Sequence, residues 1–209
     1  METMAVERGQ MRGGRRRSRW TLVVLFLMFA TPLAIAWLLN FSPWAWHPAP
    51  SLNHGRLIQP VRPLAEADFA ELAPRGAGGL VHGRWTLVFA AGPECNDRCR
   101  QALYTMRQVR LAQGHNMGRV QRLLLLLPAG RVPAWLGEVR RHYPGLRVAR
   151  MRAGAAPRLR KLFELDGAGR HSLFIVDPRA NLMMRHDLDA RPKGLIRDLQ
   201  RLLKASYIG

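Results

Sequence analysis

The chain has 209 residues, 48% of them apolar, and carries a formal net charge of +19. This length accommodates one domain of ordinary size and an appendage. So much positive charge raises the question of nucleic-acid binding, but no base-reading motif accompanies it. Only three of the 33 basic residues are lysines, and the arginines are spread along the whole chain. We therefore predict no nucleic-acid partner, and a basic surface that faces anionic lipid or acidic proteins.

The N-terminal part of the chain predicts a single membrane-spanning helix. Residues 20–39 contain no charge, and a helix of that length measures about 30 Å, the thickness of a bilayer's hydrocarbon core. Six arginines precede this stretch, whereas the next arginine after it is Arg56. The asymmetry predicts a cytoplasmic basic tail over residues 1–19 and a transmembrane helix over 20–41. A cleaved signal peptide is the alternative, but the apolar stretch is long for one.

The same asymmetry places the rest of the chain across the membrane. We predict a single-pass protein of the inner (cytoplasmic) membrane with its C-terminal domain in the periplasm; a mitochondrial membrane is the alternative. Residues 42–60 contain four prolines, which predict an extended linker. Residues 61–209 are then the folded domain.

Within this domain, short apolar runs alternate with amphipathic stretches. The β-rich runs predict strands over residues 85–91, 120–127, 146–151, 172–177 and 182–186, of which the last two form an antiparallel hairpin. Apolar residues at helical spacing predict helices over residues 99–112, 133–143, 157–165 and 192–205. Alternation of this kind predicts an α/β layer structure, and the order of elements is that of a thioredoxin-like domain behind a single N-terminal transmembrane helix.

Cys95 and Cys99 are the only cysteines, and they lie between the first predicted strand and the helix that follows it. Two thiols four residues apart at a helix start lie on one face, one turn apart. The helix N-terminus stabilises negative charge, so at least one thiol is expected to ionise readily and to act as a nucleophile or a metal ligand. In an oxidising compartment the pair can also form a disulfide. A purely structural disulfide is the alternative, but so short a loop adds little stability, which favours a chemical role.

The residues around the cysteines resemble the Sco/SenC family of membrane-anchored, thioredoxin-like cytochrome c oxidase assembly factors. Residues 83–85 (Gly-Arg-Trp) stand where the family has Gly-Lys-Trp. Residues 95–100 stand where it has Cys-Pro-Asp-x-Cys-Pro, with Asn96 and Arg100 in place of the prolines. Residues 174–178 (Phe-Ile-Val-Asp-Pro) resemble the family's late strand, which ends in Asp-Pro-x-Gly, with Ala180 in place of the glycine.

This resemblance implies that copper is bound through Cys95, Cys99 and a histidine just before the late strand, for which His171 is the candidate. His171 lies two residues closer to the Asp-Pro pair than family spacing places the ligand, and a shift of two along a strand keeps the same face. Two thiolates and an imidazole suit Cu(I). We also predict that Asp97 caps the following helix. The remaining histidines near the predicted elements, His82, His115 and His186, are expected at the surface.

Three functions are compatible with the cysteine pair and the resemblance. In the first, the chain is a copper metallochaperone that passes copper to the copper-binding subunit of cytochrome c oxidase. In the second, it is a thiol-disulfide oxidoreductase in which Cys95 attacks and Cys99 resolves, keeping oxidase cysteines reduced. In the third, it is a non-redox assembly scaffold.

Overall fold

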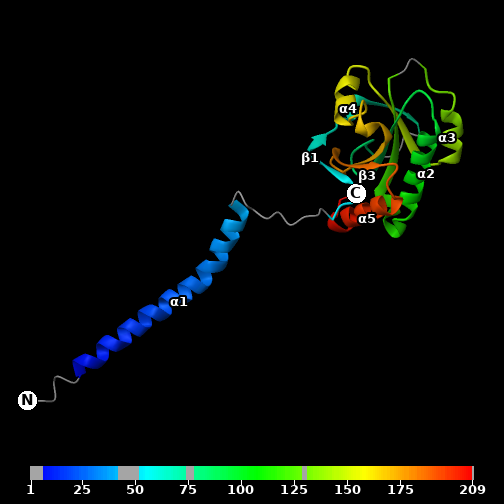
Figure 1. Cartoon of the computed structure of the whole chain (residues 1–209). Helices are drawn as coiled ribbons and strands as arrows, with labels where there is room; N and C mark the ends of the chain where they lie inside the picture. Colours follow the sequence, from blue (N-terminus) through cyan, green and yellow to red (C-terminus); the bar gives the residue numbers. More distant parts are fainter. Residues whose placement is uncertain (1–6, 42–51, 74–77, 129–130, 209) are drawn as a thin grey trace, which may run out of the picture. The chain divides into compact units, whose positions relative to one another are not determined.

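The computed structural model of the chain describes residues 7–41, 52–73, 78–128 and 131–208. The chain divides into two compact units, Met1–Pro50 and Ser51–Gly209 (Figure 1). The described part of the first unit is one helix, α1 (Glu7–Phe41). Its stretch Arg19–Leu38 is long and apolar enough to cross a membrane, as predicted for residues 20–41. The predicted basic tail is helical from Glu7 onward, so it continues the same helix.

The second unit is built on a seven-stranded mixed sheet in the order β1-β7-β6-β3-β4-β5-β2 (Figure 1). β3 runs parallel to β4 and antiparallel to β6, and β4 runs parallel to β5. All five predicted strands are present, and every residue of β4 is buried. The strands are β1 (Arg56–Pro63), β2 (Phe69–Ala73), β3 (Trp85–Ala91), β4 (Val120–Leu126), β5 (Leu146–Met151), β6 (Ser172–Val176) and β7 (Asn181–Asp187).

The two edge strands of this sheet were not predicted from the sequence. β1 pairs with β7 and β2 pairs with β5, both antiparallel. Residues 56–60, which were assigned to the linker because of the prolines, therefore belong to the sheet, while residues 42–51 of that linker lie outside the described residues. Pro60 falls where the regular pairing of β1 with β7 is interrupted, which is a position that a proline can occupy in an edge strand.

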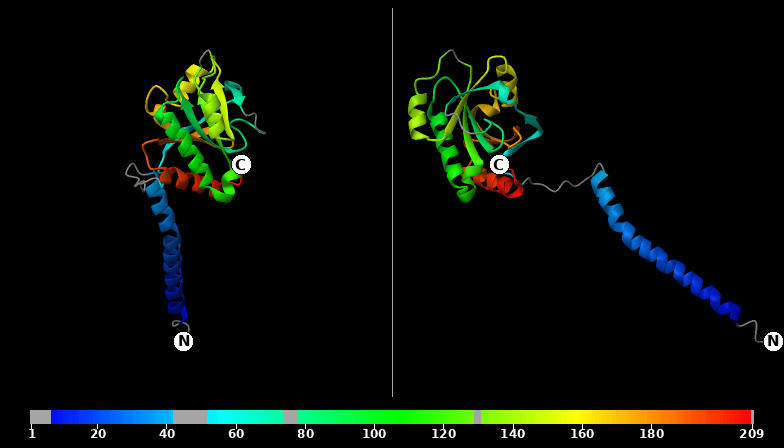
Figure 2. Two further views of the ribbon diagram at one scale, coloured as in Figure 1. Left: turned by 90° about the vertical axis from the view of Figure 1, so that its right-hand side faces the viewer. Right: turned by 180° about the vertical axis from the view of Figure 1, so that it is seen from behind.

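Helices cover both faces of the sheet. α2 (Asp97–Leu111), α3 (Leu136–His142) and α5 (Pro192–Ala205) contribute to the core on one face, and α4 (Ala156–Leu162) to the core on the other. Figure 2 shows α2 and α5, in green and red, against the sheet. α5 has the predicted bounds, α2 begins two residues before the predicted helix, and α3 begins three residues after the predicted start at Pro133.

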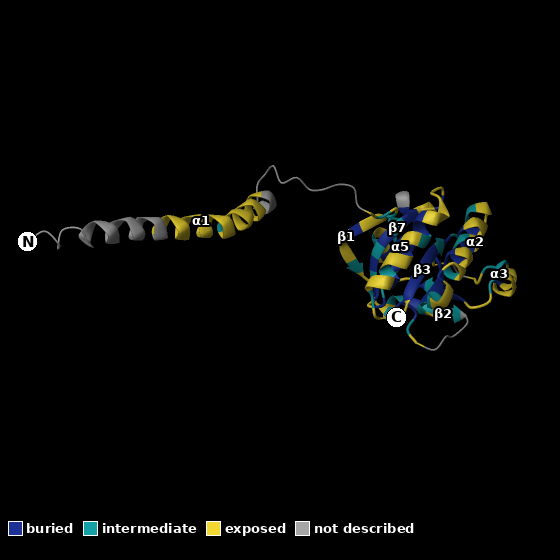
Figure 3. Cartoon of the chain, turned by 90° about the horizontal axis from the view of Figure 1, so that it is seen from below, coloured by how far each residue is buried: buried dark blue, intermediate teal, exposed yellow. Residues whose placement is uncertain are grey.

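Alternate side chains of the central strands fill these two cores. Leu87 and Phe89 of β3 pack on the side of α2, together with Cys99. Val88 packs on the opposite side, with Phe163 at the end of α4. Figure 3 shows the buried residues concentrated in the sheet and on the inward sides of the helices. The N-terminus of α2, where the cysteines lie, is thus attached to a rigid two-sided core.

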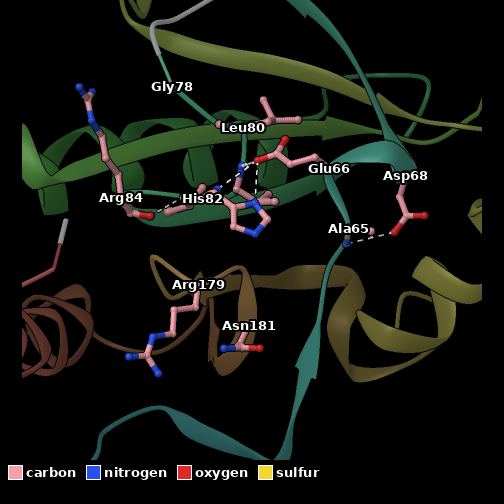
Figure 4. Close-up of polar contacts among 12 residues, drawn as sticks. Ala65, Glu66, Asp68, Gly78, Leu80, His82, Arg84, Arg179 and Asn181 are labelled. Carbon is pink, nitrogen blue, oxygen red and sulfur yellow. Dashed lines mark hydrogen bonds and ion pairs between the residues drawn. The ribbon is translucent and has the colours of Figure 1, made fainter.

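Glu66, in the 3-10 helix η1 (Glu66–Asp68), fixes the segment that leads into β3. Its Oε1 accepts hydrogen bonds from the backbone N–H of Val81 at 2.8 Å and of His82 at 3.1 Å (Figure 4). Partial burial opposes ionisation of this carboxyl, but the hydrogen bonds hold the pKa of Glu66 below its ordinary value. The side chain of His82 is exposed, as predicted, and its Nδ1 lies 3.1 Å from the same oxygen.

His186 is buried, and the prediction that it lies at the surface is wrong. Residues two apart on a strand point to the same side of the sheet, so His186 of β7 is buried like Met184 and is only 5% exposed. Its Nε2 lies 3.3 Å from Asp198 Oδ2 of α5 and 3.2 Å from Met184 Sδ. Burial lowers the pKa of His186, although the negative charge of Asp198 opposes this shift.

Asp198 also holds the start of the described domain against α5. Its Oδ2 accepts hydrogen bonds from the backbone N–H groups of His54 and Gly55, both at 2.8 Å, and its Oδ1 lies 3.0 Å from His54 Nδ1. The Arg201 side chain, also from α5, donates to the carbonyl of Leu52. A Cβ at position 55 would lie 2.3 Å from His186 Nε2, so only glycine fits there. We call these contacts the Asp198 clasp.

Candidate functional site

Helix α2 begins at the cysteine motif because Asn96 caps it. The backbone of Asn96 is extended, and its side-chain oxygen accepts a hydrogen bond from Cys99 N at 3.2 Å. This is the bond that an N-cap side chain makes to the third helical residue. The prediction that Asp97 is the cap is wrong. Asp97 is the first residue inside the helix, and its exposed carboxylate pairs with Arg100 instead.

Cys95 and Cys99 form a disulfide whose Cα atoms are 5.0 Å apart. Cys95 lies in the loop before α2 and is half-buried, whereas Cys99 lies within the helix and is 2% exposed. The two residues therefore do not share a helical face, as the sequence suggested. One sulfur belongs to the loop and the other to the core, so Cys95 is the sulfur that a partner can reach.

The loop that carries Cys95 is held from two sides. The indole N–H of Trp135, which precedes α3, donates to the carbonyl of Pro93 at 2.8 Å. The guanidinium of Arg100 donates to the carbonyl of Cys95 at 3.1 Å. From the sequence, Trp135 belonged only to the predicted helix over residues 133–143, because nothing in its spacing reveals a polar contact with a loop so distant along the chain.

A cavity of about 400 Å³ lies beside the disulfide, and both Cys99 and His171 line it. His171 is exposed and is the last residue of a 3-10 turn, η3 (Ala168–His171), so it precedes β6 instead of lying on a strand. Its carbonyl accepts a hydrogen bond from Leu188 N at 3.0 Å, which fixes the turn against the segment after β7. The fold thus brings together two residues that were singled out in distant parts of the sequence.

Cys95 opens on a different and smaller cavity, of about 240 Å³. Its walls are partly aromatic, with Trp135 and Tyr143 from the two ends of α3. His142 also lines this cavity, and its Nδ1 lies 3.0 Å from the carbonyl oxygen of Glu138. The disulfide therefore separates two cavities, with His171 on the side of Cys99 and an aromatic wall on the side of Cys95.

Residues 85–206 match the family model described as "Transmembrane-like, thioredoxin-like, C-terminal domain". The chain belongs to this family. The match begins at the first residue of β3 and ends just after α5, so it contains the cysteine loop, the turn at His171 and both cavities. The thioredoxin-like fold predicted from the sequence is confirmed.

Solved structures show the same fold. Yeast Sco1 with copper bound is 15% identical to this chain with a TM-score of 0.52, and the match covers 76% of this chain and 96% of that one. A second structure of yeast Sco1 is 16% identical with a TM-score of 0.50, covering 60% of this chain and 83% of that one. No curated protein matches the chain in sequence. The Sco/SenC resemblance of the sequence therefore extends to the three-dimensional fold.

The charge around the larger cavity of this thioredoxin-like domain is mainly positive. Three arginines line it, Arg98, Arg160 and Arg170. Among the described residues that line the cavity, Glu94 is the only acidic one. Arg98 pairs with Asp189, and its hydrogen bond lowers the pKa of that carboxyl. Positive charge and a helix N-terminus both stabilise a thiolate, so this setting favours ionised cysteines once the disulfide is reduced.

The described residues hold the donors of a metal site only in part. Across the described residues, no three His, Cys, Asp or Glu side chains are placed to hold a metal ion. Both sulfurs are engaged in the disulfide, and a thiolate is the form of cysteine that binds metal. Reduction would release two sulfur donors next to the cavity that His171 lines. Two thiolates and one imidazole are a soft donor set, so the donor types available after reduction are of the kind that suits Cu(I).

Proposed function

We propose that this chain is a membrane-anchored assembly factor for cytochrome c oxidase that binds copper through Cys95, Cys99 and His171 and delivers it to the oxidase's copper-binding subunit. The observation that carries the proposal is the cavity shared by Cys99 and His171 at the N-terminus of α2. The Sco/SenC resemblance of the sequence supports it, and so does a fold shared with yeast Sco1, which has been solved with copper bound.

Copper binding begins with reduction of the disulfide by a partner dithiol. One partner thiolate attacks Cys95, the half-buried and more accessible residue of the pair, which breaks the bond to Cys99 and releases Cys99 as a thiolate. The second partner thiol then attacks the mixed disulfide and releases Cys95. The partner leaves as a disulfide, and the chain has gained two electrons.

The reduced pair and His171 then bind Cu(I), which stays in that oxidation state during transfer. Delivery is an exchange of ligands, in which donor atoms of the oxidase subunit replace the two sulfurs and the imidazole one at a time. The half-exposed position of Cys95 and the exposed position of His171 give an incoming ligand access from outside, while the buried Cys99 holds the ion longest.

The location follows from α1 and the charges in front of it. Its stretch Arg19–Leu38 can cross a membrane, and the arginine-rich tail favours the cytoplasmic side. We accordingly place the thioredoxin-like domain in the periplasm, where oxidising conditions match the disulfide. The oxidase subunit that receives copper would meet the domain on this side.

The test is a copper titration of the full chain in neutral detergent, reduced and kept anaerobic. We expect one copper per chain with a thiolate-to-copper absorption in the ultraviolet. His171→Ala is expected to weaken binding about tenfold or more. The control is His115→Ala, since His115 is exposed and does not line the cavity. Failure of the reduced wild type to retain copper, with two titratable thiols present, overturns the proposal.

A second candidate is a thiol-disulfide oxidoreductase that keeps oxidase cysteines reduced. The observation that favours it is the aromatic-walled cavity beside the half-buried Cys95, which suits an extended partner segment with its own cysteine. His171→Ala should leave thiol exchange intact, whereas copper binding should suffer. A non-redox scaffold, the third candidate, would instead keep its activity in Cys95→Ser and Cys99→Ser.

A further inference from the structure

Arg122 is a buried cation that forms no ion pair with any residue that the structure describes. It lies on β4 and is 4% exposed, yet its Nε and Nη1 atoms have no hydrogen-bond partner among the described residues. Only Nη2 is used, donating to the carbonyl of Pro144 at 2.7 Å. Burying an unpaired guanidinium costs free energy that a typical fold avoids. An anion close by would offset that cost.

The electrostatic setting of Arg122 is positive. Burial lowers the pKa of Arg122 to about 10, with repulsion from Arg110 and Arg107 adding to the shift and Tyr143 opposing it. The guanidinium nevertheless stays charged at neutral pH. Three arginines from β4 and α2 therefore raise the potential at this end of the sheet.

A cavity of about 340 Å³ lies next to Arg122. It is formed where α3 turns into β5, and Arg140, Arg141 and Tyr143 line it together with two glycines and Leu146. Leu146 pairs with Arg122 across the sheet, and a Cβ added at Gly145 would lie 3.9 Å from Arg122 Nη2. Arg122 therefore lies behind the part of the cavity wall that Gly145 and Leu146 form.

The lining of this cavity matches an anion. Arg140 and Arg141 are exposed, and neither forms an ion pair with another described residue. None of the described residues that line the cavity is acidic. Each guanidinium group presents several N–H donors in a planar fork that suits phosphate oxygens, and Gly137 and Gly145 leave the backbone accessible.

We propose that this cavity binds a phosphate group, contacted directly by Arg140 and Arg141, with Arg122 supplying further positive potential from behind its wall. The site adjoins the smaller cavity beside Cys95, with which it shares Tyr143, and it does not depend on copper handling. Two sources of phosphate share this chemistry, the headgroup of an anionic phospholipid and a soluble phosphate. Because α1 is long and apolar enough to cross a membrane, the headgroups of anionic phospholipids would always be near the chain.

The experiment uses the full chain and has one arm for each source. In the first, thermal unfolding in neutral detergent is measured with inorganic phosphate and with chloride at equal ionic strength. In the second, the chain is reconstituted in nanodiscs of phosphatidylcholine alone or with phosphatidylglycerol, and hydrogen exchange is followed over residues 137–146. Arg140→Gln/Arg141→Gln is compared with Arg191→Gln/Arg197→Gln, which removes two exposed arginines away from the cavity.

We expect phosphate to raise the midpoint of unfolding, or phosphatidylglycerol to slow exchange over residues 137–146. The Arg140/Arg141 variant should lose about tenfold or more in affinity, whereas the Arg191/Arg197 variant should keep it. The arm that responds identifies the source. If neither arm responds in the wild type, or if both variants are affected equally, the proposed site is overturned.

Discussion

Arg98, the second residue of α2, forms an ion pair with Asp189 in the segment that follows β7. The pair closes one side of the cavity that Cys99 and His171 line, because Arg98 is part of the same wall. It raises the pKa of Arg98 and lowers that of Asp189, mainly through their hydrogen bond. The net charge near the cysteines therefore depends on a residue far from them in sequence.

Removing the Asp189 carboxylate should make the reduced cysteines ionise at lower pH. In Asp189→Asn, the positive charge of Arg98 is no longer neutralised and stabilises a nearby thiolate. We expect the pH midpoint of iodoacetamide alkylation to fall. Asp68→Asn is the control, since it breaks the Arg158–Asp68 pair, which does not line the cavity. An unchanged midpoint in Asp189→Asn would show that Arg98 does not influence the thiols.

Replacing the cap of α2 should destabilise the domain more than replacing the residue after it. Asn96→Ala removes the hydrogen bond to Cys99 N and is expected to cost about 1 kcal/mol in free energy of unfolding. Asp97→Ala removes an exposed ion pair with Arg100 and should cost less than about 0.5 kcal/mol. Urea unfolding followed by tryptophan fluorescence measures both. The reverse order would mean that Asp97 is the cap after all.

Trp135→Phe should loosen the loop that carries Cys95. The variant keeps an aromatic side chain but loses the indole donor to the Pro93 carbonyl, a loss of about 1 kcal/mol in stability. We also expect faster amide exchange over residues 93–95 and no change over residues 182–186, in the distant strand β7. Unaltered exchange around the cysteines would refute a role for Trp135 in holding this loop.

Buried His186 makes stability depend on pH. Burial lowers the pKa of His186 in the folded chain, so the unfolded chain, with the ordinary value of 6.5, binds the proton more readily. Stability should be full above pH 6.5 and should decline as the pH falls from there toward the folded pKa. Urea unfolding at a series of pH values checks this. His186→Gln cannot take up the proton, so it should flatten the decline; an equal slope in both proteins would locate the dependence elsewhere.

Arg122→Met should stabilise the domain. The substitution replaces an unpaired buried charge with an apolar side chain of similar length, and such replacements gain about 1–2 kcal/mol. Arg147→Met is the comparison, because Arg147 is equally buried but is paired with Glu71 at 2.7 Å. That variant should lose stability. Destabilisation of both variants to the same degree would show that Arg122 has a partner in solution.

The interior strands were predictable because burial on both faces leaves a continuous apolar signature. β4 is the clear case, with all seven of its residues buried. The edge strand β1 was missed because only one of its residues, Ile58, is buried and two of its eight residues are prolines. Edge strands face solvent, so their sequences carry little hydrophobic pattern. The same exposure made residues 56–60 look like linker.

The candidate site was predictable only in part. Cys95 and Cys99 could be found because they are the sole cysteines and follow a buried strand, and His171 came from the family resemblance. The cavity arginines Arg98 and Arg160 could not be found, because arginine is so abundant in this chain that no single one is informative. Their roles arise from the packing of segments that are distant in sequence.

The Asp198 clasp has a mechanical consequence for a domain whose chain also carries an apolar helix long enough to cross a membrane. A pull transmitted along the chain from residue 52 meets the bonds of His54 and Gly55 to Asp198 before it reaches β1. The load therefore enters the fold at α5, which packs against the core, and the edge strand is spared from being peeled away one hydrogen bond at a time. Tension on the chain before residue 52 would thus strain the last helix before it reaches the edge strand.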